Sequence, residues 1–291
     1  MYLGDVLVTG GAGFVGSHLC EKLLSQTQGR VVSLDNYFTG SKDNHVEGVE
    51  YITGDSEKID SLITFKPSYI FHLGEYSRVE KSFDDLEIVF SSNVIGTLKV
   101  FEFAKKTSAK IIYAGSSTKF GDDGDNADAS PYAWSKSANT KLIKNMGDWY
   151  GVKFAITYFY NVYGPREISD GEYATLIALF ERKIQLGEPL TVVFPGTQNR
   201  NFTHVDDICA ALLLIGLHGE GDNFGIGSDE AFSVLEIAEL FGGKIEMLPE
   251  RRGNRMTADV VSHKTRKLGW SPKRALKDYI ASIHDKRGNL K

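Results

Sequence analysis

A glycine-rich turn near the start of the chain constrains the fold more than any other stretch. The segment from Val6 to Leu19 is VLVTGGAGFVGSHL, in which an apolar run leads into Gly10, Gly13 and Gly16. Gly10 allows a tight turn, Gly13 lets a phosphate approach the backbone, and Gly16 lets the following helix lie close to the sheet. The N–H groups and the positive dipole end of that helix favour an anion. We predict a strand, a turn and a helix that bind a dinucleotide pyrophosphate; the alternative is an ordinary strand–helix turn.

An aspartate follows the second apolar run. Residues 30–34 (RVVSL) predict a strand, and Asp35 lies 19 residues beyond Gly16. A carboxylate at this spacing accepts hydrogen bonds from the adenosine ribose of NAD and repels the 2′-phosphate of NADP. An acid that only closes a strand is the alternative. Together with the glycines, Asp35 predicts NAD as the cofactor.

Strands and helices continue to alternate through the first half of the chain. Apolar runs at 49–52, 69–73 and 110–114 predict short strands, and residues 83–106 and 132–149 have helical spacing. This alternation predicts an α/β fold with a Rossmann-type doubly wound parallel sheet. Ligands of such sheets bind at the carboxyl ends of the strands. We expect the cofactor to contact Gly10, Gly13, Phe14, Val15, Gly16, Asp35, Asn36, Asp55, Ser56, Leu73, Gly74, Glu75 and Asn93.

Two polar residues of this half invite more than one interpretation. His72 lies at the end of a predicted strand, and we expect it to be a packed, hydrogen-bonded histidine and not a catalyst. Asn93 and Gly96 interrupt the helical segment 83–106. The Asn93 amide could hydrogen-bond to backbone near the cofactor, or it could be a helix-surface amide.

The composition narrows the class of protein and of partner. The chain has 291 residues, 42% of them hydrophobic and 24% charged, which is ordinary for a globular protein with a real core. A net charge of −5 with dispersed basic residues predicts no nucleic-acid partner. Cys20 and Cys209 lie in apolar runs, so we expect buried thiols and a reducing cytoplasm. We expect no signal peptide and no membrane contact, because the longest apolar run, 208–217, is too short to span a bilayer.

A tyrosine and a lysine four residues apart carry the first sign of catalysis. Tyr132 and Lys136 lie in the segment PYAWSK, where Pro131 suits a helix start, so both side chains share one helix face. A nearby ammonium stabilises a phenolate, which lets the tyrosine act as a base toward a sugar hydroxyl while a hydride leaves to NAD. Ser116, at the end of the preceding strand, could share that proton network. A helix-surface pair is the alternative.

These motifs together resemble the extended short-chain dehydrogenase/reductase family, in its nucleotide-sugar epimerase and dehydratase branch (UDP-glucose 4-epimerase-like). TGGAGFVGSHL, HLGEYSRVEKS, NVIGT, GSSTKFG, PYAWSK, YFYNVYGPRE and RNFTHVDDI follow the family's order over nearly the whole chain. The resemblance implies that Ser116, Tyr132 and Lys136 are catalytic and that Lys136 also holds the nicotinamide ribose. It also implies that the segment beginning at Tyr158 passes from the cofactor to the substrate. We expect Tyr158 to contact the cofactor.

The same resemblance implies a nucleoside diphosphate sugar as the ligand. Asn161 would contact its diphosphate, and Arg200 and Arg251 would supply positive charge, for which a planar guanidinium is suited. A surface salt bridge is the alternative for Arg200. Asn254 would meet the nucleotide ribose, although the family usually has Asp there. We also expect the hydroxyls Ser117 and Thr118 to contact the substrate.

One departure from the family bears on the reaction. Family dehydratases carry one or two acids after the catalytic hydroxyl, whereas Ser116 is followed by Ser117 and Thr118. This resembles the 4-epimerases, which need only oxidation at carbon 4, rotation of the ketose and hydride return. Glu75 stands where small residues are more usual, and the segment 120–130 is short for the family.

We therefore predict an NAD-dependent nucleotide-sugar epimerase that inverts carbon 4 of an NDP-hexose. The NAD-binding domain would comprise residues 1–164 and about 197–227, and the substrate domain 165–196 and 228–291. Dehydratase, reductase and 4-dehydrogenase activities remain alternatives on the same scaffold, and a non-catalytic NAD-sensing module is an alternative of another class. We expect no metal, and a homodimer formed through the helices at 83–106 and 132–149.

Overall fold

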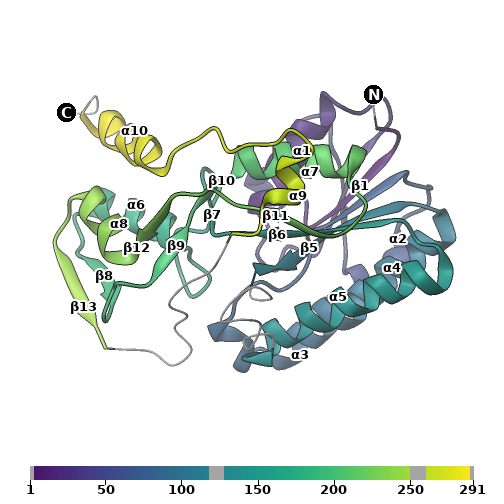
Figure 1. Cartoon of the computed structure of the whole chain (residues 1–291), viewed down its shortest axis with the longest axis horizontal. Coiled ribbons are helices and arrows are strands. Elements are labelled where there is room, and N and C mark those ends of the chain that lie inside the picture. The colour runs from purple at the N-terminus through teal and green to yellow at the C-terminus, as the bar shows by residue number, and fades with distance from the viewer. Residues whose placement is uncertain (1–2, 118–127, 250–259, 289–291) are drawn as a thin grey trace.

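A seven-stranded parallel sheet organises the larger of two lobes (Figure 1). The computed structural model describes residues 3–117, 128–249 and 260–288. The strand order is β11-β6-β5-β4-β1-β2-β3, and every pair is parallel. This confirms the predicted doubly wound fold. The strands are β1 Val6–Thr9, β2 Val31–Asp35, β3 Glu50–Thr53, β4 Tyr69–His72, β5 Lys110–Ser116, β6 Phe154–Phe159 and β11 Gly221–Ile226.

Helices cover both faces of this sheet. On one face α1 and α7 pack with Val6, Val8 and Phe71 of the sheet, and on the other α4 and α5 pack with Ile111 and its neighbours. Both layers consist mainly of buried apolar side chains, as expected for a sheet covered on both faces. The helices are α1 Phe14–Leu24, α2 Ile59–Leu62, α3 Leu86–Val89, α4 Thr97–Thr107, α5 Pro131–Tyr150, α7 Val205–His218 and α9 His263–Arg266.

The helical segment predicted at 83–106 is not one regular helix. Phe90–Gly96, between α3 and α4, is π-helical. This segment contains Asn93 and Gly96, the two residues expected to interrupt the helix. Asn93 is fully buried, so its amide is not on the helix surface. π-Helical turns inside α-helices often occur at functional sites.

A smaller lobe has its own core, in which α6, β8, α8 and α10 bury Phe180, Leu190, Phe241 and Ile280 (Figure 1). Helix α8 begins with a capping box, in which Ser233 and Glu236 each bond through the side chain to the other's backbone N–H. The division at the predicted domain boundaries stays a prediction. The remaining elements are β7 Val162–Tyr163, α6 Leu176–Leu186, β8 Leu190–Val193, β9 Asn199–Asn201, β10 Thr203–His204, β12 Ala231–Ser233, α8 Val234–Phe241, β13 Ile245–Leu248 and α10 Leu276–Gly288.

Several predictions about single residues are confirmed. Cys20 and Cys209 are buried and free. His72 is fully buried between the hydroxyls of Thr9 and Thr97, at 2.7 and 2.9 Å.

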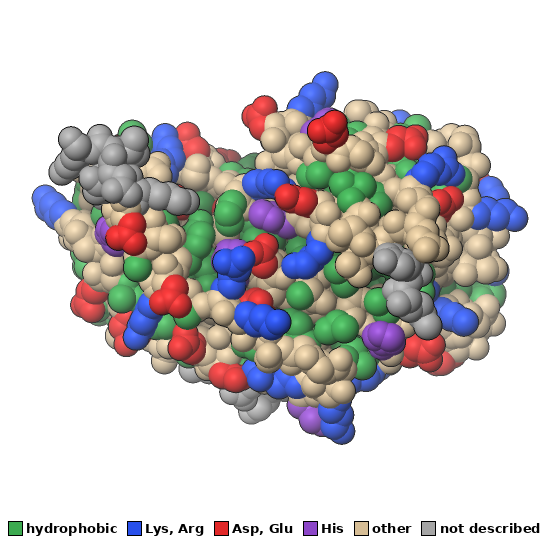
Figure 2. Space-filling model, turned by 90° about the horizontal axis from the view of Figure 1, so that it is seen from above, with side chains coloured by type: hydrophobic (Ala, Val, Ile, Leu, Met, Phe, Trp, Pro, Cys, Tyr) green, Lys and Arg blue, Asp and Glu red, His purple; other side chains and the backbone are tan. Residues whose placement is uncertain are grey.

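On the face shown in Figure 2, acidic and basic side chains are interspersed. No described helix has the length and apolarity needed to cross a membrane.

Candidate active site

One large cleft runs along the carboxyl ends of the central strands and continues between the two lobes. Its volume is about 1960 Å³, whereas small-molecule sites are typically about 300–1,000 Å³. The cleft can therefore hold a dinucleotide and a second ligand together. From the cofactor prediction its lining includes Gly10, Gly13, Phe14, Val15, Gly16, Asp35, Asn36, Asp55, Ser56, Leu73, Gly74 and Glu75.

The glycine turn has the geometry that a bound pyrophosphate needs. Gly10 has φ +74°, and a Cβ there would lie 2.8 Å from the Gly74 backbone. A Cβ on Gly16 would lie 2.0 Å from the Gly10 carbonyl oxygen, so only glycine allows α1 to start this close to β1. Gly13 is the N-cap of α1 and supplies no capping side chain. The helix start therefore has N–H groups for an anion.

Asp35 closes β2 beside this turn. Its carboxylate accepts hydrogen bonds from the backbone N–H groups of Tyr37 and Ala12, at 2.8 and 2.9 Å. Burial raises its pKa, and these two hydrogen bonds oppose that rise. The carboxylate is thus held in place in the cleft wall. Next to it, the Asn36 amide donates to Asp55 at 2.9 Å.

The three residues with predicted catalytic roles all line the same cleft. Ser116 is the last residue of β5, while Tyr132 and Lys136 lie one turn apart on α5. The local sequence fixes the start of this helix, because the Ser130 side chain accepts a hydrogen bond from the Ala133 N–H and Pro131 occupies the first turn.

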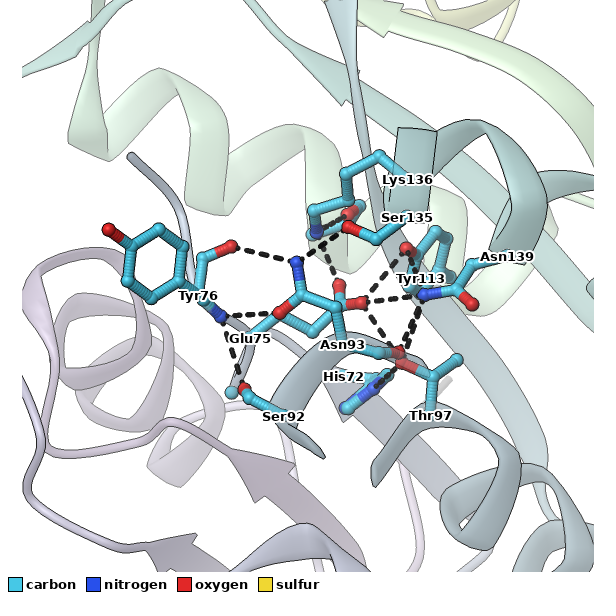
Figure 3. A network of polar contacts seen from close by, with 12 residues as sticks. His72, Glu75, Tyr76, Ser92, Asn93, Thr97, Tyr113, Ser135, Lys136 and Asn139 are labelled. Atoms are coloured by element: carbon cyan, nitrogen blue, oxygen red, sulfur yellow. Dashed lines mark hydrogen bonds and ion pairs between the residues drawn. The ribbon is translucent and has the colours of Figure 1, made fainter. Parts of the chain in front are cut away.

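Lys136 has a partner that the sequence analysis did not assign. Its ammonium forms an ion pair with the Glu75 carboxylate (Figure 3). The ammonium also donates a hydrogen bond to the Ala114 carbonyl at 2.7 Å. The pair is buried, with side chains 6% and 1% exposed. Glu75 Oε1 also accepts hydrogen bonds from Thr97, Tyr113 and Asn139, at 2.9, 3.0 and 3.0 Å.

Two residues expected to contact the cofactor lie outside the cleft lining. The Asn93 amide is bonded to both backbone polar groups of Tyr76, at 2.7 and 3.1 Å, so it braces the loop that lines the cleft (Figure 3). The Tyr158 hydroxyl donates to Asp222 at 2.6 Å, and the next residue, Phe159, lines the cleft instead. Successive residues of a strand point to opposite faces, which explains this correction for Tyr158.

The small-lobe side of the cleft carries part of the predicted substrate set. Asn161 and Arg200 line it, as does Ser117 on the opposite side. The Asn161 amide donates to the Asn201 carbonyl at 2.9 Å, and Arg200 donates to the Asn199 carbonyl at 2.9 Å. Thr118, Arg251 and Asn254 lie outside the described residues.

Two charged residues of the cleft were missed by sequence reasoning. Burial raises the pKa of Glu167 to about 7, against smaller opposing effects of Thr175 and the Gly164 N–H. Within the described chain, Glu167 Oε1 is buried without a directed hydrogen bond. Arg78 lines the cleft and donates twice to the Tyr173 carbonyl, at 3.0 and 2.5 Å. Both residues lie in quoted motifs, HLGEYSRVEKS and YFYNVYGPRE, but only the fold shows that they face a common cleft.

The loops that carry these residues meet across the cleft. Tyr76 of the large lobe and Tyr173 both donate hydrogen bonds to Asp85, each at 2.8 Å. Lys81 pairs with Glu172 at 3.0 Å. Within the part of the chain that the structure describes, no cluster of His, Cys, Asp and Glu could hold a metal ion.

The comparisons with known proteins agree with this geometry. The model of the NAD dependent epimerase/dehydratase family matches residues 6–227. The chain therefore belongs to this family, and its cofactor is NAD. This confirms the resemblance identified in the sequence.

Individual relatives span nearly the whole chain. It is 31% identical to UDP-glucuronic acid decarboxylase 6 of Arabidopsis thaliana, covering 96% of this chain and 88% of that protein. It is 30% identical to a putative UDP-glucose 4-epimerase of Methanocaldococcus jannaschii, covering 96% of both.

Two solved structures are also similar over almost their full length. The UDP-glucose 4-epimerase of Thermotoga maritima, solved with UDP-glucose, has a TM-score of 0.89 and 27% identity, with 99% and 100% of the two chains covered. The UDP-glucose 4-epimerase of Thermus thermophilus, in complex with NAD, has a TM-score of 0.86 and 27% identity, with 98% and 99% covered.

Proposed function

We propose that the protein is an NAD-dependent nucleotide-sugar epimerase that inverts carbon 4 of an NDP-hexose through a transient 4-ketose. The observation that carries the proposal is that the glycine turn, Ser116, Tyr132 and Lys136 line one cleft. The size of the cleft supports simultaneous binding of NAD and a nucleotide sugar. A relative described as a putative UDP-glucose 4-epimerase and the solved structure of a UDP-glucose 4-epimerase support the reaction.

The residues of α5 supply the proton chemistry. Bound NAD would accept a hydride from the sugar and return it. Tyr132, as the phenolate, takes the proton of the sugar hydroxyl, and Lys136 stabilises that phenolate. Ser116 is placed at the end of β5 to hydrogen-bond to the same hydroxyl. After the ketose has rotated in the cleft and the hydride has returned to its other face, Tyr132 returns the proton to the oxygen at carbon 4.

The small-lobe side of the cleft would hold the nucleoside diphosphate. Arg200 is suited to the diphosphate because its guanidinium presents a planar fork of donors. Asn161 and Ser117 line the cleft where they can add hydrogen bonds. Thr118, Arg251 and Asn254, by the family resemblance, would complete the set.

A 4,6-dehydratase is the second candidate, and Glu167 is the observation that favours it. The absence of an acid after Ser116 weighs against dehydration, but the cleft has a carboxyl group from another segment, whose pKa is about 7. A group with such a pKa can give and take protons near neutral pH. Glu167 would then replace the family acids in removing the proton at carbon 5.

One experiment separates the candidates. The purified protein is incubated with UDP-, dTDP- and GDP-hexoses and the products are identified by NMR, while NADH is followed by its absorbance. We expect a carbon 4 epimer and no net NADH. A 4-keto-6-deoxy sugar would identify a dehydratase, a pentose from a uronic acid would identify a decarboxylase, and net NADH would identify a dehydrogenase. No turnover of any sugar would favour an NAD-sensing module.

We also propose that two copies pair through α3, α4 and α5. Large apolar side chains are exposed on all three helices, namely Leu86 and Ile88 on α3, Leu98 on α4, and Trp134 and Trp149 on α5. Leaving such a surface in water is unfavourable, and a second copy would cover it. Light scattering at the peak of a sizing column should give twice the chain mass of 32.2 kDa; a monomer would refute the pairing.

A further inference from the structure

The buried ion pair at Lys136 carries an inference about the cofactor's oxidation state. We propose that Glu75 is a charge-compensating and positioning residue, which fixes the Lys136 ammonium and cancels its charge, so that oxidised NAD is favoured over NADH. The inference rests on the proposed function in one respect, namely that the nicotinamide lies beside Tyr132 and Lys136. It does not depend on which sugar reacts.

The contacts of Glu75 show why its carboxylate suits this role. Lys136 and Asn139 have N–H groups that can only donate, and both point at Glu75, together with the hydroxyls of Thr97 and Tyr113 (Figure 3). Such convergence of donors stabilises an anion and holds it in one position. The ammonium that it pairs with is held from a second direction by the Ala114 carbonyl.

The neighbouring titratable groups do not add charge to the pair near neutral pH. Burial lowers the pKa of His72 to about 4, so the imidazole is neutral. Burial raises the pKa of Tyr113 well above its ordinary value, so the phenol is also neutral. Arg78 acts electrostatically on Tyr132 from elsewhere in the cleft wall, and its charge is the same in every variant discussed below.

The charge balance matters because the two forms of the cofactor differ at the nicotinamide ring. The ring is a cation in NAD and neutral in NADH. A lysine ammonium without compensation would repel the cation in a poorly solvated site, whereas the Glu75–Lys136 pair has no net charge. One unit charge a few ångströms from the ring, at an effective dielectric constant between that of water and that of a protein surface, changes the preference by roughly tenfold or more.

The test measures the dissociation constants of NAD and NADH, by competition against the fluorescence of bound NADH. Glu75→Gln should raise the NAD constant relative to the NADH constant by roughly tenfold. Lys136→Met should shift the ratio in the opposite direction. The double variant, which is again neutral, should return the ratio to near that of the parent protein, and a buried neutral pair is often tolerated.

Two controls separate charge from structure. Tyr113→Phe removes one hydrogen bond to Glu75 without changing the charge, and Glu87→Gln removes a carboxylate from α3 in the lining of the same cleft; neither should change the ratio. Equal weakening of NAD and NADH in Glu75→Gln would overturn the inference and leave Glu75 a structural residue. If Lys136→Met changes neither constant, the proposed nicotinamide position is wrong. Should Glu75→Gln not fold, the shift expected in Lys136→Met and its return to near the parent ratio in the double variant still test the inference.

Discussion

Glu75 and Glu167 are carboxylates of the same cleft, and their surroundings give them opposite properties. Glu75, on the large-lobe side, accepts hydrogen bonds from four side chains, one of which is an ammonium. Glu167 accepts a hydrogen bond from the Gly164 N–H at 3.1 Å, and among the described residues its other oxygen has no hydrogen-bond partner. Burial raises the pKa of Glu167 to about 7. The large-lobe side is thus organised around a fixed ion pair, whereas Glu167 can change its charge near neutral pH.

The largest expected effect is on chemistry at the large-lobe side. Tyr132→Phe removes the proposed base, so kcat should fall by about 10²–10⁴-fold while NAD still binds. Steady-state assays with the active sugar and an NAD titration measure this. Tyr150→Phe, at the exposed end of the same helix, is the matched control and should have parent activity. A fall in kcat of less than tenfold would show that a residue other than Tyr132 is the base.

Loss of Glu75 should be the largest effect on stability. Glu75→Ala leaves the Lys136 ammonium buried without its carboxylate, which should lower the free energy of unfolding by about 3–5 kcal/mol. Urea unfolding followed by fluorescence measures it. Glu102→Ala breaks an exposed pair with Lys99 and should have a much smaller effect on the free energy of unfolding, because water screens the two charges. Equal decreases in the free energy of unfolding for the two variants would show that the buried Glu75–Lys136 pair contributes no more to stability than an exposed pair.

Glu167 should make the free energy of unfolding decrease as pH rises, because its pKa is higher in the folded protein than in the unfolded chain. The folded protein binds this proton up to about pH 7, whereas the unfolded chain releases it near its ordinary value of 4.5. The contribution of Glu167 to the stability of the parent protein therefore falls as pH rises from 5 to 8, and Glu167→Gln should gain about 2–3 kcal/mol relative to the parent over that range. Urea midpoints at the two pH values measure the gain. A constant difference would mean that Glu167 is already ionised at pH 5.

His72 should give a smaller effect of the opposite sign. Its folded-state pKa is lowered to about 4 from 6.5, so its contribution to stability is present at pH 7 and is lost as the pH falls. Between pH 7 and pH 5 the parent protein should lose about 2 kcal/mol from this group. The stability deficit of His72→Gln should shrink by that amount on acidification. If the deficit were the same at both pH values, the imidazole would be readily protonated in the fold.

Much of this cleft could be predicted from local sequence. The glycine turn, Asp35 and the pair Tyr132 and Lys136 each have a spacing that follows directly from strand and helix geometry. All of them line the cleft.

The rest depends on contacts between distant segments. Glu75 and Lys136 are 61 residues apart, and nothing in either motif says that they form an ion pair. Glu167 lies between β7 and α6, and its pKa is raised by burial, which the motif that contains it does not reveal. Tyr158 was assigned by motif position, and the strand alternation that points it away from the cleft becomes decisive only once the register of β6 is known.

The most direct test of the account follows the hydrogen at carbon 4. A nucleotide sugar that proves active, prepared with deuterium at carbon 4, is converted by the protein, and the label is located by NMR. Removal and return of a hydride within one cleft predict an inverted carbon 4 that keeps its deuterium, without net NADH. Deuterium on carbon 6, or its loss to water, would contradict an epimerase that works by transient oxidation at carbon 4.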